Sequence, residues 1–110
     1  MTQTLNDAPD DPLEQLLKGT ARTVTINPDA RMFVDEQLAG VGIFSGPFNP
    51  LHDGHIRLAH VAAETLRIPV LFELPIINAD KAPIHYIEIC RRISQFGGLH
   101  KIVLTRTSLF

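Results

Sequence analysis

From Val41 to Leu104 the chain alternates short apolar runs with segments of helical periodicity, and this alternation restricts the fold more than any other feature. Val41–Phe44 is an apolar run of the kind that is buried on both faces of a sheet, and the Ser-Gly-Pro sequence at 45–47 ends it. The next segment begins near Gly54 and carries apolar side chains on one helical face, at Ile56, Ala59, Ala63 and Leu66. A strand followed by a helix is therefore predicted.

The same alternation repeats before the chain ends. Pro69 stops the first helix, and Val70–Phe72 forms a second apolar run. Residues 84–96 predict an amphipathic helix, whose apolar stripe consists of Tyr86, Ile89, Cys90, Ile93 and Phe96. After two glycines, Lys101–Leu104 predicts a third strand. The order βαβαβ predicts an α/β protein, namely half of a Rossmann-like, doubly wound parallel sheet in a three-layer αβα arrangement.

Residues 1–40 are less regular, and we expect them to form an N-terminal appendage. A leucine cluster has the spacing of one or two helical turns, at Leu13, Leu16 and Leu17. Arg22–Ile26 alternates polar and apolar side chains like a short strand, and the Asn-Pro-Asp sequence at 27–29 predicts a turn. Met32–Leu38 is compatible with a short helix.

Composition excludes several classes of protein. A chain of 110 residues with 45% hydrophobic side chains fits one packed domain. Its net charge of -2 lacks the basic excess of a protein that binds long nucleic acids, so no nucleic-acid partner is expected. The single cysteine, Cys90, excludes an internal disulfide framework, and we expect it to be an inert core residue. Residues 1–11 do not form a secretory signal, and no segment is long enough to span a membrane, so a cytoplasmic location is expected.

The residues that carry chemistry lie in the loop between the first predicted strand and helix. In an open α/β sheet, ligands bind at this edge, where strands end and helix N-termini attract anions. Gly46 and Gly54 allow the backbone to approach a ligand closely. His52 and His55 lie three residues apart across the junction, and both can donate hydrogen bonds to oxygens that gain charge in a transition state. A phosphate site that needs no nucleophilic side chain is predicted.

This segment resembles the nucleotidylyltransferase superfamily of cytidylyltransferase-like proteins. The family signature, Gly-Gly-Ser/Thr-Phe-Asp/Asn-Pro-x-His-x-Gly-His, is filled here by Gly46, Phe48, Asn49, Pro50, His52, Gly54 and His55. Two positions depart from it, because Ser45 replaces a glycine and Pro47 replaces a hydroxyl residue. The resemblance implies that 41–110 is a nucleotide-binding domain in which His52 and His55 are catalytic. It also implies that the nucleotide lies against Gly46, Pro47, Phe48, Asn49 and Gly54.

A second similarity follows the second predicted strand. Asn78 and Lys81 resemble the Asn-x-x-Lys segment with which several members of this family meet the acceptor phosphate, and Arg91 resembles a family arginine. The resemblance covers 41–104, roughly the first half of the family's catalytic domain, and lacks its later triphosphate-binding motif. We therefore expect the fold to be incomplete at Phe110, the isolated chain to self-associate, and its activity to need the remainder of the domain.

The resemblance implies transfer of a nucleoside monophosphate from ATP or CTP to a small phosphorylated acceptor, with release of pyrophosphate and with Mg²⁺ on the phosphates. One alternative is a nucleotide-binding or interaction module without catalysis. Another is a fragment of a class I aminoacyl-tRNA synthetase, which the Phe-Asn-Pro sequence at 48–50 and the slightly acidic chain disfavour. A zinc site at the two histidines is also disfavoured, because His60, His85 and Cys90 are the only further His or Cys ligands nearby.

Overall fold

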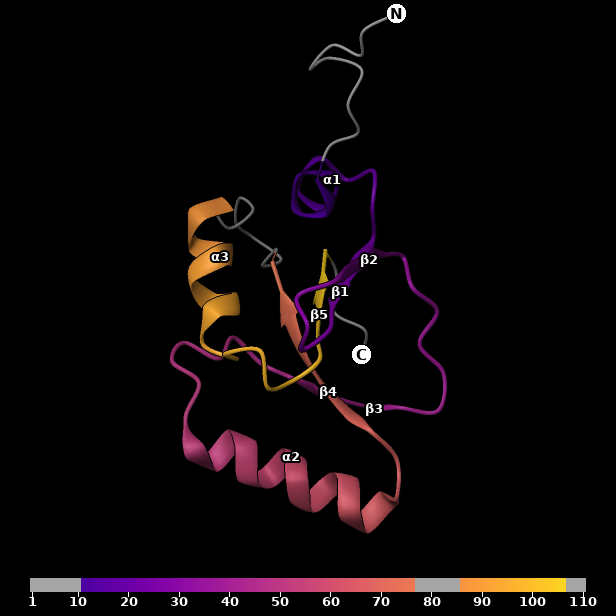
Figure 1. Ribbon diagram of the computed structural model, residues 1–110, viewed down its shortest axis with the longest axis vertical. Coiled ribbons are helices and arrows are strands. Elements are labelled where there is room, and N and C mark those ends of the chain that lie inside the picture. Colours follow the sequence, from indigo (N-terminus) through magenta and orange to yellow (C-terminus); the bar gives the residue numbers. More distant parts are fainter. Residues whose placement is uncertain (1–10, 77–85, 107–110) are drawn as a thin grey trace, which may run out of the picture.

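A computed structural model of the chain describes residues 11–76 and 86–106 (Figure 1). The helices are α1 (Pro12–Lys18), α2 (Asp53–Leu66) and α3 (Tyr86–Ser94). The strands are β1 (Thr23–Ile26), β2 (Met32–Val34), β3 (Gly42–Ser45), β4 (Val70–Pro75) and β5 (Ile102–Thr105). The chain is thus an α/β protein, as the alternation from Val41 onward predicts.

One five-stranded mixed sheet, in the order β2-β1-β5-β4-β3, organises the fold. Strands β3, β4 and β5 are mutually parallel and are joined through α2 and α3, which confirms the predicted βαβαβ unit. Strand β1 pairs antiparallel with both β5 and β2. Consequently β3 lies at one edge of the sheet and the β1–β2 hairpin at the other.

The hydrophobic core lies on the face of the sheet that the helices cover. The strand register places Phe44 beside Phe72, Phe72 beside Ile102, and Ile102 beside Ile26, so these side chains share that face. Each helix contributes a buried side chain to the same cluster, namely Leu16 from α1, Ala59 from α2 and Ile89 from α3. This packing holds α2 and α3 against the parallel strands β3, β4 and β5.

Segments expected to form an appendage contribute to this sheet and core. Asp11 caps α1 by accepting a hydrogen bond from the Glu14 amide at 3.1 Å, and Leu13 and Leu16 are buried. Strand β1 confirms the strand predicted at 22–26. The helix expected over Met32–Leu38 is wrong, because the turn at 27–30 closes a hairpin that pairs Met32–Val34 with β1.

The opposite face of the sheet is crossed by the segment that joins β2 to β3. Glu36 in that segment accepts a hydrogen bond from Thr25 Oγ1 at 2.9 Å and forms an ion pair with Lys101 Nζ at 3.1 Å. On the same face, Thr105 Oγ1 donates to Glu73 Oε2 at 2.9 Å, with both residues buried. The three helices of the described part all pack on the other face, which carries the hydrophobic core.

Three side chains expected on the apolar faces of the helices are exposed, and one of them is Tyr86, at 37%. Leu66 is 60% exposed. It is the last residue of α2 and lies two turns beyond Ala59, the side chain that this helix buries in the core. Cys90 is exposed because it lies one residue along α3 from the buried Ile89 and is rotated away from the sheet. Among the residues described, no helix is both long and apolar enough to cross a membrane.

Candidate functional site

The candidate site is a loop that leaves the carboxyl end of β3 and enters α2. A cavity of about 410 Å³ opens there, lined by Phe44, Ser45, Gly46, Pro47, Phe48, Asn49, Pro50, His52 and His55. Seven of the residues that the sequence assigns to catalysis or nucleotide binding lie in this segment, and all of them except Gly54 line the cavity. The fold therefore gathers them at the edge of the parallel strands where ligands are expected.

The two histidines cap the N-terminus of α2. His52 is the N-cap residue, and its Nδ1 accepts a hydrogen bond from the Gly54 amide at 3.1 Å. The His55 Nδ1 in turn accepts from the His52 amide at 3.1 Å, which completes a reciprocal capping box. The three-residue spacing of the pair is thus the spacing of a capping box, with imidazoles in place of the usual side chains.

These caps also determine where the imidazole protons are. A backbone amide can only donate, so each Nδ1 must present its lone pair, and the proton of the neutral ring must lie on Nε2. In the described part of the chain, neither Nε2 atom has a hydrogen-bond partner. Both histidines are therefore prepared to donate Nε2–H bonds to a ligand in the cavity.

The surroundings of His55 keep it neutral. Its ring lies edge-on to Phe48, with centroids 5.0 Å apart, and edge-on to Phe44 at 6.0 Å. Partial burial, followed by repulsion from a charged His52, lowers the pKa of His55 below its ordinary value. At neutral pH, His55 is then an uncharged hydrogen-bond donor. The positive potential at the site comes instead from the N-terminus of α2.

Glycine is required at two positions by close contacts with the rings of the site. A Cβ atom at Gly54 would lie 3.0 Å from His52 Cε1 and 3.1 Å from His52 Nδ1. A Cβ atom at Gly46 would lie 3.3 Å from Cζ of Phe48. The two glycines thus leave room for the cap of His52 and for the ring that supports His55.

Phe48 anchors the loop to the core. Its side chain is 2% exposed and packs edge-on against Phe44, Phe72 and Phe96. Its backbone φ of 42° lies in the left-handed region that non-glycine residues rarely adopt. Burial of the ring holds this conformation, which turns the chain from β3 toward the histidines.

Arg91 is brought to the loop from α3. Its Nη2 donates to Asn49 Oδ1 at 2.9 Å, and its Nε donates to Glu88 Oε1 at 2.8 Å. Hydrogen bonds from Arg91 and Arg92 lower the pKa of Glu88 to about 2, so this carboxylate stays charged. The structure therefore places Arg91 beside Asn49, 42 residues apart in the chain. The other predicted acceptor residues, Asn78 and Lys81, lie outside the described residues.

The sequence analysis missed Gln95 as a residue of the site. Gln95 directly follows α3, and its side chain bonds the main chain of the loop at Phe48 and Leu51. The sequence gives no local signal for these contacts, because the partners are 44 and 47 residues apart and a glutamine on a helix surface is common.

The described residues around the cavity do not by themselves make a metal centre. None of the residues that line the 410 Å³ cavity is acidic, and the described ranges hold no cluster of three or more His, Cys, Asp or Glu side chains suited to a metal. His60 is exposed and pairs with Glu64 at 3.1 Å instead of turning to the histidine pair. Mg²⁺ usually binds through one or two carboxylates and substrate phosphates, so these residues do not form a Mg²⁺ site by themselves.

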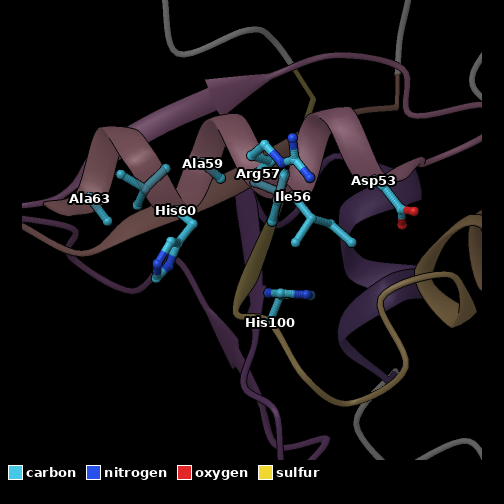
Figure 2. A pocket seen from close by; sticks show the side chains of 9 residues that line it. Asp53, Ile56, Arg57, Ala59, His60, Ala63 and His100 are labelled. Atoms are coloured by element: carbon cyan, nitrogen blue, oxygen red, sulfur yellow. The ribbon is translucent and has the colours of Figure 1, made fainter. Parts of the chain in front are cut away.

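A larger cavity, of about 530 Å³, lies on another side of α2 (Figure 2). Figure 2 shows Ile56 and His60 extending from α2 on the side of His100, whose ring lies edge-on to Phe72 with centroids 5.5 Å apart. Neither His52 nor His55 lines this cavity. Volume therefore does not identify the candidate site, whereas the convergence of donors on the β3–α2 loop does.

Comparison with known proteins gives one partial similarity. The chain is 46% identical over 35 residues to a probable nicotinate-nucleotide adenylyltransferase from Desulfotalea psychrophila. Over that stretch it resembles a nucleotidyltransferase. The matched stretch is 32% of this chain and only 17% of the length of the relative. No family profile matches the chain, and no solved structure matches it.

Proposed function

We propose that the chain carries the nucleotide-phosphate site of a nucleotidyltransferase, which transfers a nucleoside monophosphate from ATP or CTP to a small phosphorylated acceptor. The observation that carries this proposal is the capped histidine pair, in which both Nδ1 atoms are occupied by backbone amides and both Nε2–H groups remain for a ligand. The partial similarity to an adenylyltransferase supports the same class of reaction.

In the proposed reaction, an oxygen of the acceptor phosphate attacks the α-phosphorus of the nucleotide. The bond from the α-phosphorus to its bridging oxygen breaks, and pyrophosphate leaves. His52 and His55 donate hydrogen bonds to phosphate oxygens that gain charge in the transition state, and the N-terminus of α2 adds its partial positive charge. Neither histidine has to transfer a proton. Mg²⁺ would accompany the triphosphate as part of the substrate.

The acceptor side of the site is proposed to lie toward α3. Arg91 presents a guanidinium beside Asn49, and guanidinium groups suit phosphate oxygens. Asn78 and Lys81 are proposed to complete this side, as the family resemblance implies. Because the partial relative is a probable nicotinate-nucleotide adenylyltransferase, ATP and nicotinate mononucleotide are the first pair of substrates to test.

Calorimetric titration with ATP and with CTP, in the presence of Mg²⁺, tests the binding part of the proposal. We expect one nucleotide to bind the unchanged protein and the double variant His52→Ala/His55→Ala to bind it several-fold more weakly, while His60→Ala keeps the affinity. Pyrophosphate release with nicotinate mononucleotide then tests transfer. Failure of the folded protein to bind either nucleotide would overturn the proposal.

The second candidate function is a module that binds a nucleotide without transferring it. The capped histidine pair supports this alternative too, because its Nε2–H groups can bind phosphate oxygens whether or not transfer follows. Nucleotide binding that depends on the histidines, without pyrophosphate release from any tested phosphorylated acceptor, would distinguish this module from an enzyme.

A further inference from the structure

The loop between Phe48 and Leu51 depends on the side chain of Gln95, the residue that follows α3, for its main-chain hydrogen bonds. Gln95 Nε2 donates to the Phe48 carbonyl oxygen at 2.7 Å, and Gln95 Oε1 accepts from the Leu51 amide at 2.8 Å. Among the residues that the structure describes, no main-chain to main-chain hydrogen bond involves residues 47–51. One amide group therefore links the carbonyl and the amide on either side of the turn at Asn49–Pro50.

The chemistry of this clamp fits glutamine closely. The Phe48 carbonyl requires a donor and the Leu51 amide requires an acceptor, and a carboxamide supplies both on one planar group. A glutamate offers only acceptors when ionised, and a methionine of similar length offers no strong partner. The clamp is also specific in position, because Leu51 directly precedes His52, the N-cap of α2.

We propose that Gln95 is a positioning residue of the phosphate site, which fixes the Phe48–Leu51 loop and through it the placement of the His52 and His55 rings. Gln95 lies four residues after Arg91, directly beyond the end of α3, and both residues contact the Phe48–Leu51 loop. Phe48 fixes the start of the loop through its buried ring, whereas the end next to His52 is fixed by the Gln95 bond to Leu51. The role of the histidines toward phosphate rests on the proposed function, but the clamp itself is measurable without a substrate.

Three variants of the full chain test this inference. Gln95→Met keeps the size of the side chain and removes both bonds to the loop, together with the 3.1 Å bond from Nε2 to the Arg92 carbonyl. Gln95→Glu keeps the acceptor for Leu51 and removes the two donor bonds, to Phe48 and to Arg92. Ser94→Ala is the matched control, because the Ser94 hydroxyl donates only within α3, to the Arg91 carbonyl at 2.6 Å. The readouts are amide hydrogen exchange at Leu51 and the ¹⁵N chemical shifts of the histidine rings, which report which nitrogen carries the proton.

We expect exchange at Leu51 to accelerate about tenfold in Gln95→Met and to change little in Gln95→Glu and Ser94→Ala. In Gln95→Met the His52 and His55 ring signals should shift toward the mixture of protonation states seen in the urea-unfolded chain, and the nucleotide dissociation constant should rise several-fold. The rise follows because a displaced donor no longer meets the phosphate in its required geometry.

Unchanged Leu51 exchange in Gln95→Met would overturn the inference, and so would loss of protection in Gln95→Glu. Faster exchange with unchanged histidine signals would also overturn it, because the clamp would then hold the loop without placing the rings. If the unchanged protein binds neither ATP nor CTP, the proposed function fails and the exchange and ring signals alone decide the role of Gln95. If Gln95→Met does not fold, Gln95→Ala, which removes the same hydrogen bonds, is measured against Ser94→Ala with the same expected outcomes.

Discussion

The imidazole rings of His52 and His55 stack with their centroids 3.7 Å apart and their planes inclined by 24°. Each Nδ1 accepts a hydrogen bond from a backbone amide, and repulsion from His52, after burial, lowers the pKa of His55. The helix cap and the proposed phosphate donors are therefore the same two groups.

Replacing His55 with alanine tests the proposed role in transfer. If transfer is observed, His55→Ala should lower turnover by about 10² to 10³ and affect nucleotide affinity less, because the donor is aimed at charge that develops in the transition state. Steady-state kinetics of pyrophosphate release measure both quantities. His60→Ala serves as the control for the loss of an imidazole from α2, and wild-type turnover in His55→Ala would contradict the assignment.

Stability should depend on pH through His55. Its pKa is lowered in the folded protein, so the unfolded chain binds this proton more readily than the folded chain. The contribution of His55 is fully present above the ordinary histidine pKa of 6.5 and is lost as the pH falls through the lowered folded pKa. Urea unfolding at a series of pH values from 8 to 5 measures the effect. His55→Gln, which cannot titrate, should show a flatter profile, and an equally steep one would refute the prediction.

Gly54→Ala should change nucleotide binding without a matching change in the stability of α2. Alanine is the better helix former by up to about 1 kcal/mol, yet its Cβ would lie about 3 Å from the His52 ring and push that ring off its cap. We expect weaker nucleotide binding with little change in the free energy of unfolding, measured by calorimetry and urea titration. An alanine variant that binds nucleotide as tightly as the wild type would show that the His52 cap is not required.

The exposure of Cys90 predicts that its thiol is reactive in the folded state. A colorimetric thiol reagent should react with native protein at a rate within about tenfold of that for the urea-unfolded chain, because no packing shields the sulfur. A native thiol that reacts several orders of magnitude more slowly would instead indicate a buried side chain. Cys90→Ser provides the blank for the assay.

Apolar groups exposed at one edge of the sheet predict self-association. Among the strands of residues 11–76 and 86–106, β3 pairs with β4 alone, and α2 exposes Leu58, Val61 and Leu66. Sedimentation velocity should show a mass that rises with protein concentration, and Val61→Lys should reduce this rise. A strictly monomeric protein across the concentration range would exclude association through these groups.

The elements from β3 to β5 were predictable from the sequence, because apolar runs and helical periodicity each span enough residues to be distinct. The position of the histidine loop followed from the same pattern. The strand at Met32–Val34 was not predictable, because three residues carry no clear period and their conformation depends on pairing with β1. The Gln95 contacts were equally hidden, since they join residues that only the tertiary fold brings together.

The antiparallel pairing of β1 with β5 has a consequence for the chemistry of the sheet. Reversing the strand direction at that border places the carboxyl ends of β5 and β1 at opposite margins of the sheet. The margin suited to phosphate groups is therefore only three strands wide, formed by β3, β4 and β5, and the histidine loop stands at its outer end. A further parallel strand could extend this margin only by pairing with β3. Such a strand would end beside the loop of His52 and His55 and would place its own side chains next to the two imidazoles.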